Sequence, residues 1–143
     1  MKRTSFAADD CPVARSLDAV GDWWSLLIVR DAFAGKRRFG EFEKSLGIAK
    51  NILTDRLRRL VAAEVLEQVP ASDGSAFREY ALTESGRGLL LVIAALGQWG
   101  EGDASSAFAL VDRKRGKPVR LELRTEDGRK VALDDAQLTP SNR

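Results

Sequence analysis

Histidine is absent from the sequence, and cysteine occurs once, at Cys11. Without histidine, the Ser-His and Cys-His pairs of nucleophilic catalysis cannot form, and most zinc sites lose a usual ligand. A single cysteine excludes an internal disulfide and a cysteine cluster that binds metal. No stretch places two carboxylates in an obviously apolar pocket, as acid-base catalysis by carboxylates would require. The sequence therefore indicates neither an enzyme nor a cofactor or metal site.

Long hydrophobic runs are absent as well. The longest, residues 89–96, has eight residues, whereas a membrane-spanning helix needs roughly 20. No apolar segment follows the basic residues Lys2 and Arg3, so no secretory signal is recognised and a cytoplasmic location is expected. With 143 residues, 44% hydrophobic and 31% charged, the chain is typical of one globular domain with an appendage at most.

The net charge of +2 is distributed unevenly along the chain. Residues 36–59 contain eight basic and three acidic side chains, a net charge of +5, so the rest of the chain carries −3. Such a local excess of positive charge is typical of a surface that binds phosphates. The basic residues are Lys36, Arg37, Arg38, Lys44, Lys50, Arg56, Arg58 and Arg59.

Residues 47–64, at the centre of this basic segment, have the pattern of an amphipathic helix. At about 100° per residue, Leu53, Leu57, Leu60 and Val61 share one apolar stripe. The opposite face carries short polar groups and a guanidinium, which are able to read base edges in a DNA groove. The pattern fits a recognition helix, and it also fits an ordinary solvated helix. The opposite face consists of Asn51, Thr54, Asp55, Arg58 and Ala62.

Three further helices are predicted before this one. Pro12, which is favoured in the first turn of a helix, begins the first, with Cys11 at its cap. The second is apolar on nearly all sides and is expected at the centre of the fold. The third is joined to the 47–64 helix by a tight turn containing Gly47, which is the arrangement of a helix-turn-helix. These helices are expected at 12–20, 22–34 and 39–46.

After Glu64 the helical pattern gives way to the alternation of β-strands. Residues 65–69 and 77–82 flank a turn and predict a β-hairpin, the wing of a winged helix. Thr83 is then expected to cap one long helix with an apolar face that runs from Leu89 to Trp99.

The predicted fold class is therefore mainly α with a β-hairpin wing. A winged helix-turn-helix domain is expected in residues 1–102, followed by a small β-rich C-terminal extension in 103–143. The extension has short alternating segments at 108–111, 119–123 and 130–133, and an end expected to be disordered from Thr139 onward.

Several motifs in a fixed order resemble the HxlR-type family of bacterial winged-helix transcription regulators, which are relatives of the MarR group. The resemblance covers roughly residues 11–100, and the ordered set is far more specific than any one motif. The extension is similar to one found on some members and is much less diagnostic. The motifs are Cys11-Pro12, Gly21-Asp22-Trp23-Trp24, Arg38-Phe39, Leu53-x-x-Arg56-Leu57-x-x-Leu60 and Tyr80-Ala81-Leu82-Thr83-x-x-Gly86.

This resemblance implies a homodimer that binds double-stranded DNA at a pseudo-palindromic operator, in the cytoplasm of a bacterium and on the nucleoid when bound. Each helix-turn-helix would enter a major groove, and each wing would lie against the flanking backbone. Dimer contacts are expected around 13–20 and 89–99. The sequence departs from the usual pattern at Trp23, where many members have a basic residue, and at Ala49-Lys50, where Ser-Pro is common.

Six residues are predicted to contact DNA. Lys50 and Asn51 lie in the first helical turn, where backbone amides favour a phosphate. Asn51, Thr54 and Arg58 suit base edges. Arg78 on the wing suits phosphate or the minor groove, and Arg38 either contacts DNA or anchors the third helix to a carboxylate. Two positions stay open: Asp55 accepts from cytosine or pairs with Arg59, and Arg56 forms an internal ion pair or contacts DNA.

Cys11 is the candidate redox sensor. In several relatives the matching cysteine senses quinones, aldehydes or thiol oxidants, and the alternative is a buried structural cysteine. The helix dipole favours its thiolate, whereas Asp9 and Asp10 oppose it. A small-molecule effector is also possible, with Trp23, Trp24 and Trp99 as pocket walls or as packing residues. Two other functions remain open: a winged-helix module that binds a protein, and a small-molecule receptor with weak DNA binding.

Overall fold

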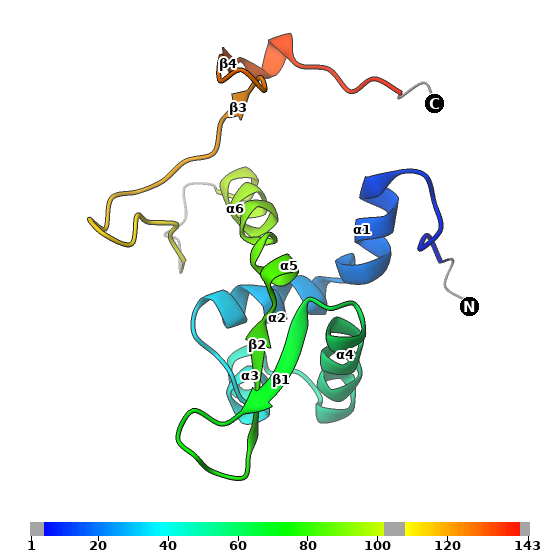
Figure 1. Cartoon of the computed structure of the whole chain (residues 1–143), viewed down its shortest axis with the longest axis vertical. Helices are drawn as coiled ribbons and strands as arrows, with labels where there is room; N and C mark the ends of the chain where they lie inside the picture. The colour runs from blue at the N-terminus through cyan, green and yellow to red at the C-terminus, as the bar shows by residue number, and fades with distance from the viewer. Residues whose placement is uncertain (1–4, 102–107, 141–143) are drawn as a thin grey trace. The chain divides into compact units, whose positions relative to one another are not determined.

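The computed structural model describes residues 5–101 and 108–140 (Figure 1). The chain divides into two compact units, Met1–Ile93 and Ala94–Arg143, each of which is described by itself. The last three residues of the end expected to be disordered lie outside the described residues. None of the described helices is long and apolar enough to cross a bilayer.

The first unit contains the four predicted helices followed by the predicted hairpin (Figure 1). Their order and approximate bounds confirm a mainly α fold with a β-hairpin wing. Helices α3 and α4, joined by a short turn, make the helix-turn-helix. The elements are α1 (Pro12–Val20), α2 (Trp23–Phe33), α3 (Phe39–Leu46), α4 (Lys50–Ala62), β1 (Leu66–Pro70) and β2 (Arg78–Leu82).

Local chemistry sets where these helices begin and end. The carboxylate of Asp22 accepts a hydrogen bond from the backbone N–H of Ser25 at 2.9 Å and so caps α2. Gly47 ends α3 in the left-handed conformation, with φ of 62°, which a residue with a side chain rarely adopts. This reversal directs the chain into α4 within three residues.

The core of the first unit is built around α2, which packs against α1, α3, α4 and β2. Ile28 and Val29 of α2 and Phe42 of α3 are completely buried. Every third or fourth residue of α4 faces this core, as the sequence pattern predicts, and the side chains there are at most 1% exposed. These residues are Leu53, Leu57 and Leu60.

The wing is an antiparallel hairpin whose register pairs Leu66 with Leu82 and Pro70 with Arg78. Leu66 is buried and β1 contacts α4, so the base of the hairpin is anchored in the core. Residues 71–77 form the loop at its tip (Figure 1).

The prediction of one long helix after Thr83 is wrong, because the structure has two helices there. Helix α5 (Glu84–Arg87) is a single turn, and α6 (Leu90–Trp99) follows it. Gly88 donates its N–H to the carbonyl of Ser85 at 3.1 Å. This bond spans three residues, as in a 3₁₀-helix, and the α-helical hydrogen bonding of α5 ends here. Glycine is a poor helix former, which explains the break at this position.

The second unit has much less regular structure than its alternating sequence suggests. Two short strands, β3 (Leu123–Arg124) and β4 (Lys130–Val131), pair in antiparallel fashion, and a 3₁₀ turn, η1 (Leu133–Asp135), follows. Val111 and Pro118 form an isolated bridge where a strand was expected. None of residues 108–140 is buried, so no hydrophobic face stabilises longer strands.

Gly86 tests how α5 is fixed to the hairpin. A Cβ at this position would lie 2.1 Å from the carbonyl oxygen of Val65. Gly86→Ala should therefore lower the free energy of unfolding by about 1–3 kcal/mol, measured by urea titration. Gly40→Ala is the matched control, because its Cβ would meet nothing within 4 Å, and it should be neutral or stabilising by up to about 1 kcal/mol. Equal effects of the two substitutions would contradict the close approach at Gly86.

Candidate nucleic-acid interface

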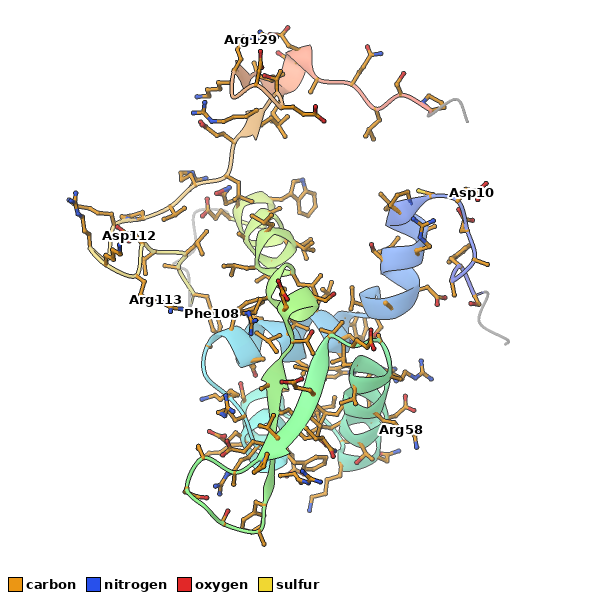
Figure 2. All side chains as sticks on the ribbon, in the orientation of Figure 1. Asp10, Arg58, Phe108, Asp112, Arg113 and Arg129 are labelled. Carbon is orange, nitrogen blue, oxygen red and sulfur yellow. The ribbon has the colours of Figure 1, made fainter. Side chains whose placement is uncertain are left out.

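The outward face of α4 is solvent-exposed and carries mostly polar side chains. Lys50, Asn51, Thr54 and Arg58 are all exposed, while the leucines on the opposite side are buried. The side chain of Arg58 is 75% exposed, and Figure 2 shows it at the surface of α4. The structure therefore brings four of the six predicted DNA-contacting residues together on one face of one helix.

Asp55 organises the arginines of α4. Its carboxylate pairs with Arg56 at 2.6 Å, with Arg58 at 3.0 Å and with Arg59 at 3.0 Å. Desolvation opposes ionisation of Asp55, but the hydrogen bond from Arg58 and the nearby arginine charges outweigh it and lower its pKa. One carboxylate thus holds three guanidinium groups beside the polar face and leaves a net positive charge there.

Arg56 connects α4 to the beginning of α2. Its Nε donates to Asp22 Oδ1 at 3.1 Å, on the same carboxylate that caps α2. Desolvation opposes ionisation of Asp22, whereas hydrogen bonds from Ser25 and the charge of Arg56 lower its pKa. Of the two possibilities for Arg56, the structure shows the internal ion pair.

Thr54 already uses its hydroxyl proton within the helix. Its Oγ1 donates to the carbonyl oxygen of Lys50 at 2.8 Å, four residues back. The hydroxyl can still accept a hydrogen bond, and the exposed side chain keeps its methyl group for apolar contact.

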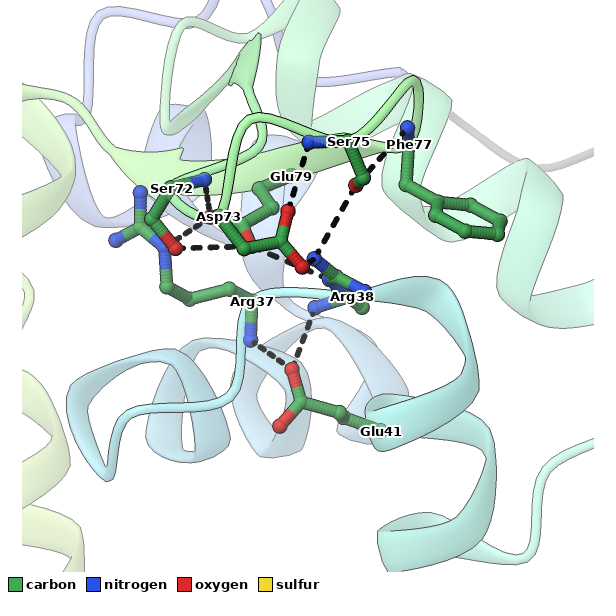
Figure 3. Close-up of polar contacts among 8 residues, drawn as sticks. All are labelled: Arg37, Arg38, Glu41, Ser72, Asp73, Ser75, Phe77 and Glu79. Carbon is green, nitrogen blue, oxygen red and sulfur yellow. Dashed lines mark hydrogen bonds and ion pairs between the residues drawn. The ribbon is translucent and has the colours of Figure 1, made fainter.

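The wing is clamped to the start of α3 by a buried carboxylate (Figure 3). Glu79 on β2 is 3% exposed and accepts from Arg37 Nε at 2.8 Å and from Arg38 Nε at 3.2 Å. Ser72 adds its backbone N–H at 3.2 Å and its hydroxyl at 3.3 Å. The Arg37 hydrogen bond is the largest influence, and together with the contacts from Ser72 and Arg38 it lowers the pKa of Glu79 to about 2 against the opposing effect of burial.

Arg38 also reaches the tip of the wing. Its guanidinium pairs with Asp73 at 2.6 Å and lies 5.4 Å from the centre of the Phe77 ring (Figure 3). These contacts correspond to the carboxylate-anchoring role that the sequence left open for Arg38. Arg78, by contrast, is exposed and has no side-chain partner among the described residues.

Cys11 occupies the N-cap of α1 and is exposed. Its backbone N–H donates to the Asp9 carboxylate at 2.8 Å. Within the single chain, the Cys11 side chain is therefore exposed and not part of the core.

Apolar side chains are exposed on α1 and, separately, on α6. Val13 is 65% exposed and Leu17 is 54% exposed on α1. On α6, Leu91, Leu96 and Trp99 are 65%, 48% and 88% exposed. Such unpartnered helix faces are typical of protein interfaces. Of the other tryptophans, Trp24 packs against the core, whereas Trp23 is exposed.

The roles of Glu79 and Asp22 were missed from the sequence. Glu79 lies between Arg78 and Tyr80, where strand alternation alone does not tell which face is buried. The sequence feature that could have predicted a buried carboxylate is the pair Arg37-Arg38. If either of these adjacent arginines is partly buried, it needs a carboxylate partner.

The clamp predicts a specific pH dependence of stability. A carboxylate whose pKa is depressed in the folded state stabilises the fold above its unfolded pKa, and this contribution is lost as the pH falls through the folded pKa. Glu79→Gln should therefore lower the free energy of unfolding at neutral pH, and its difference from wild type should shrink as the pH falls from 4.5 towards about 2. Urea unfolding at a series of pH values measures this.

Glu67→Gln, at an exposed position of β1, is the matched control and should change stability little at any pH. A Glu79→Gln difference that does not change with pH would show that Glu79 acts through packing rather than charge.

Comparison with known proteins agrees with this architecture. The HxlR-like helix-turn-helix family model matches residues 19–107. The HTH-type transcriptional regulator Rv3095 of Mycobacterium tuberculosis is 42% identical over 113 residues, which are 79% of this chain and 67% of that protein.

Solved structures give the same result. PA1607, described as a candidate transcription factor, is 50% identical with a TM-score of 0.84, covering 96% of this chain and 100% of that chain. The reduced form of the redox regulator HypR is 32% identical with a TM-score of 0.57, covering 63% of this chain and 90% of that chain. The chain belongs to the HxlR-like helix-turn-helix family and is a transcriptional regulator of the winged helix-turn-helix type.

Proposed function

We propose that the protein is a homodimer that binds a pseudo-palindromic DNA operator through α4 and the wing. The observation that carries this proposal is the exposed polar face of α4, backed by leucines that fix the helix to the core. The face has no bulky side chain at its N-terminal end, so a major groove about 12 Å wide can admit it. Because the regulator acts on DNA, the cytoplasm of a bacterium is the proposed location.

The residues of the polar face fall into two groups: those that position the protein on the DNA backbone and those that read the base sequence. Lys50 and the backbone amides of the first turn of α4 suit a phosphate, which fixes register without reading sequence. Asn51 suits adenine, Thr54 suits a base edge or a thymine methyl, and Arg58 suits guanine. Asp55 supports this assignment for Arg58, because it holds the guanidinium from one side while 75% of the side chain remains exposed.

The wing supplies a second contact. Arg78 is exposed and unpaired among the described residues, so it suits a phosphate or the minor groove. Arg38 faces Asp73 and Glu79 instead, and we assign it to holding the wing in place. Contact between Arg38 and DNA would require it to leave these two carboxylates.

The exposed apolar faces support dimerisation. Val13 and Leu17 on α1, and Leu91 and Leu96 on α6, leave apolar surface in water that a second copy would cover. A two-fold dimer presents two copies of α4, which predicts half-sites about one helical turn apart.

Base reading by α4 is tested by Asn51→Ala and Arg58→Ala. Each should reduce the preference for operator over scrambled duplex by about 1–3 kcal/mol while leaving the fold unchanged. Fluorescence anisotropy on a duplex that wild-type protein selects from a randomised pool measures this preference, and circular dichroism checks the fold.

Arg87→Ala is the control for Arg58→Ala, because Arg87 is exposed on α5 and its loss changes the net charge by the same amount. It should keep operator preference. Full preference in both α4 variants would contradict the recognition-helix assignment. Failure of the wild-type protein to select any duplex would favour a winged-helix module that binds a protein, or a small-molecule receptor.

We further propose that Cys11 makes DNA binding sensitive to oxidants. Its exposure at the N-cap of α1, a helix assigned to the dimer, supports this, as does the similarity to a protein named a redox regulator. With no second cysteine in the chain, oxidation would join Cys11 to the Cys11 of a second subunit or to a small thiol, and in either case the two thiols lose two electrons and two protons to the oxidant. Alkylation of Cys11 by an electrophile is the third reaction open to it.

An added thiol oxidant such as diamide should lower operator affinity of the wild type at least several-fold, and dithiothreitol should restore it. Cys11→Ser should bind operator normally and not respond to the oxidant. Non-reducing electrophoresis reports whether a disulfide-linked dimer forms at the same time. An equal response of wild type and Cys11→Ser would exclude Cys11 as the sensor.

A further inference from the structure

The second unit contains a turn of unpaired basic side chains, which we call the basic turn, residues 112–117. Its sequence is Asp112-Arg113-Lys114-Arg115-Gly116-Lys117, with four cations and one carboxylate, a net charge of +3. All four cations are exposed. In the part of the chain that the structure describes, none of their side chains has a hydrogen-bond or ion-pair partner.

This lack of partners distinguishes the basic turn from the arginines of the basic segment in the first unit, residues 36–59. The arginines around α3 and α4 are satisfied by carboxylates of their own unit, as are Arg120, Arg124 and Lys130 in the second unit. The satisfied arginines of the first unit are Arg37 and Arg38 with Glu79, and Arg56, Arg58 and Arg59 with Asp55.

Backbone hydrogen bonds hold the basic turn in shape. Asp112 donates its N–H to Lys117 at 2.8 Å, and Gly116 donates to Asp112 at 2.7 Å with φ of 67°. The carboxylate of Asp112 accepts from the backbone N–H of Lys114 at 2.9 Å, so the one acidic group closes the turn instead of pairing with a cation. Figure 2 marks Asp112 and Arg113 on this turn.

We propose that the basic turn binds backbone phosphates of duplex DNA and adds sequence-independent affinity to the contacts of the winged helix. The inference rests on the proposed function. Four cations within five residues are the chemistry that phosphate binding requires, and arginine can hold a phosphate through two parallel hydrogen bonds. Because the turn is covalently attached to the DNA-binding unit, its effective concentration near bound DNA is high. A weak affinity of the turn itself for phosphate is then enough to add to the binding.

Duplex DNA fits this turn better than other polyanions. Residues 111–118 contain no aromatic side chain, so they offer no platform on which the bases of a single strand could stack. They also contain no amphipathic helix, which is the usual device for lying on a lipid surface.

The test compares the full-length wild type with the variant Arg113→Gln/Lys114→Gln/Arg115→Gln on two duplexes. One is a duplex selected by the wild type from a randomised pool, and the other is a scrambled duplex of the same length. The variant should bind both roughly tenfold or more weakly at low salt, and the slope of log affinity against log salt should fall by up to about 0.9 for each lost contact. The ratio of affinities for the two duplexes should stay unchanged, because phosphate contacts carry no base information.

Two controls separate charge from structure. Arg124→Gln/Arg129→Gln/Lys130→Gln removes three charges from the neighbouring hairpin of the same unit, where Arg124 and Lys130 already pair with Glu122, and it should bind much as wild type does. Arg113→Lys/Arg115→Lys keeps the charge and should retain the wild-type salt slope.

Wild-type affinity and slope in the Gln variant would overturn the inference while leaving the proposed function intact. A changed duplex ratio with an unchanged slope would also overturn it. If the wild type selects no duplex at all, the proposed function fails and the inference fails with it.

Discussion

The position of the wing depends on one buried carboxylate. Glu79 is almost inaccessible, and it keeps its charge because Arg37, Arg38 and Ser72 surround it with donors. Removing one partner from such a cluster leaves a charge that water cannot reach, so these residues are fixed as a group. The consequence is geometric: β2 cannot move relative to the start of α3 without breaking the cluster. The wing and the helix-turn-helix therefore behave as one surface.

Carboxylates also decide which cations are left for DNA. Asp22 forms an ion pair with Arg56 and so holds α4 against the N-terminus of α2. Asp55 forms ion pairs with Arg58 and Arg59, whose side chains stay largely exposed. The local charge of +5 read from residues 36–59 thus overstates the charge available to a ligand, because much of it stabilises the fold. What remains outward on α4 is a small set of polar groups with Arg58 and Lys50, a composition suited to reading bases as much as to neutralising phosphates.

Periodicity and turn chemistry predicted most of the first unit. Leu53, Leu57 and Leu60 lie one helical turn apart and are buried as expected, and Gly47 ends α3 as a left-handed cap. The prediction of one long helix after Thr83 was wrong, because the spacing of apolar residues does not reveal that the hydrogen bonds around Gly88 span three residues instead of four. The partner of Arg37 and Arg38 could not be identified from the sequence for a different reason. Arg37 and Glu79 are 42 residues apart in sequence, and only the fold brings them together.

The difference between the two units follows from the same physics. The first unit buries enough apolar surface to place carboxylates beside arginines at fixed distances, so the arginines around α3 and α4 form ion pairs within the unit. In residues 108–140 nothing is buried, and the strands are two residues long. The ion pairs of this segment, such as those of Glu122 with Arg124 and Lys130, are exposed, and an exposed pair contributes only about 0–1 kcal/mol. The four cations between Arg113 and Lys117 have no carboxylate partner among the described residues and lie in water, where a polyanion can displace their counterions. On the proposed function, a rigid unit reads the sequence of the DNA and a weakly structured one contributes charge.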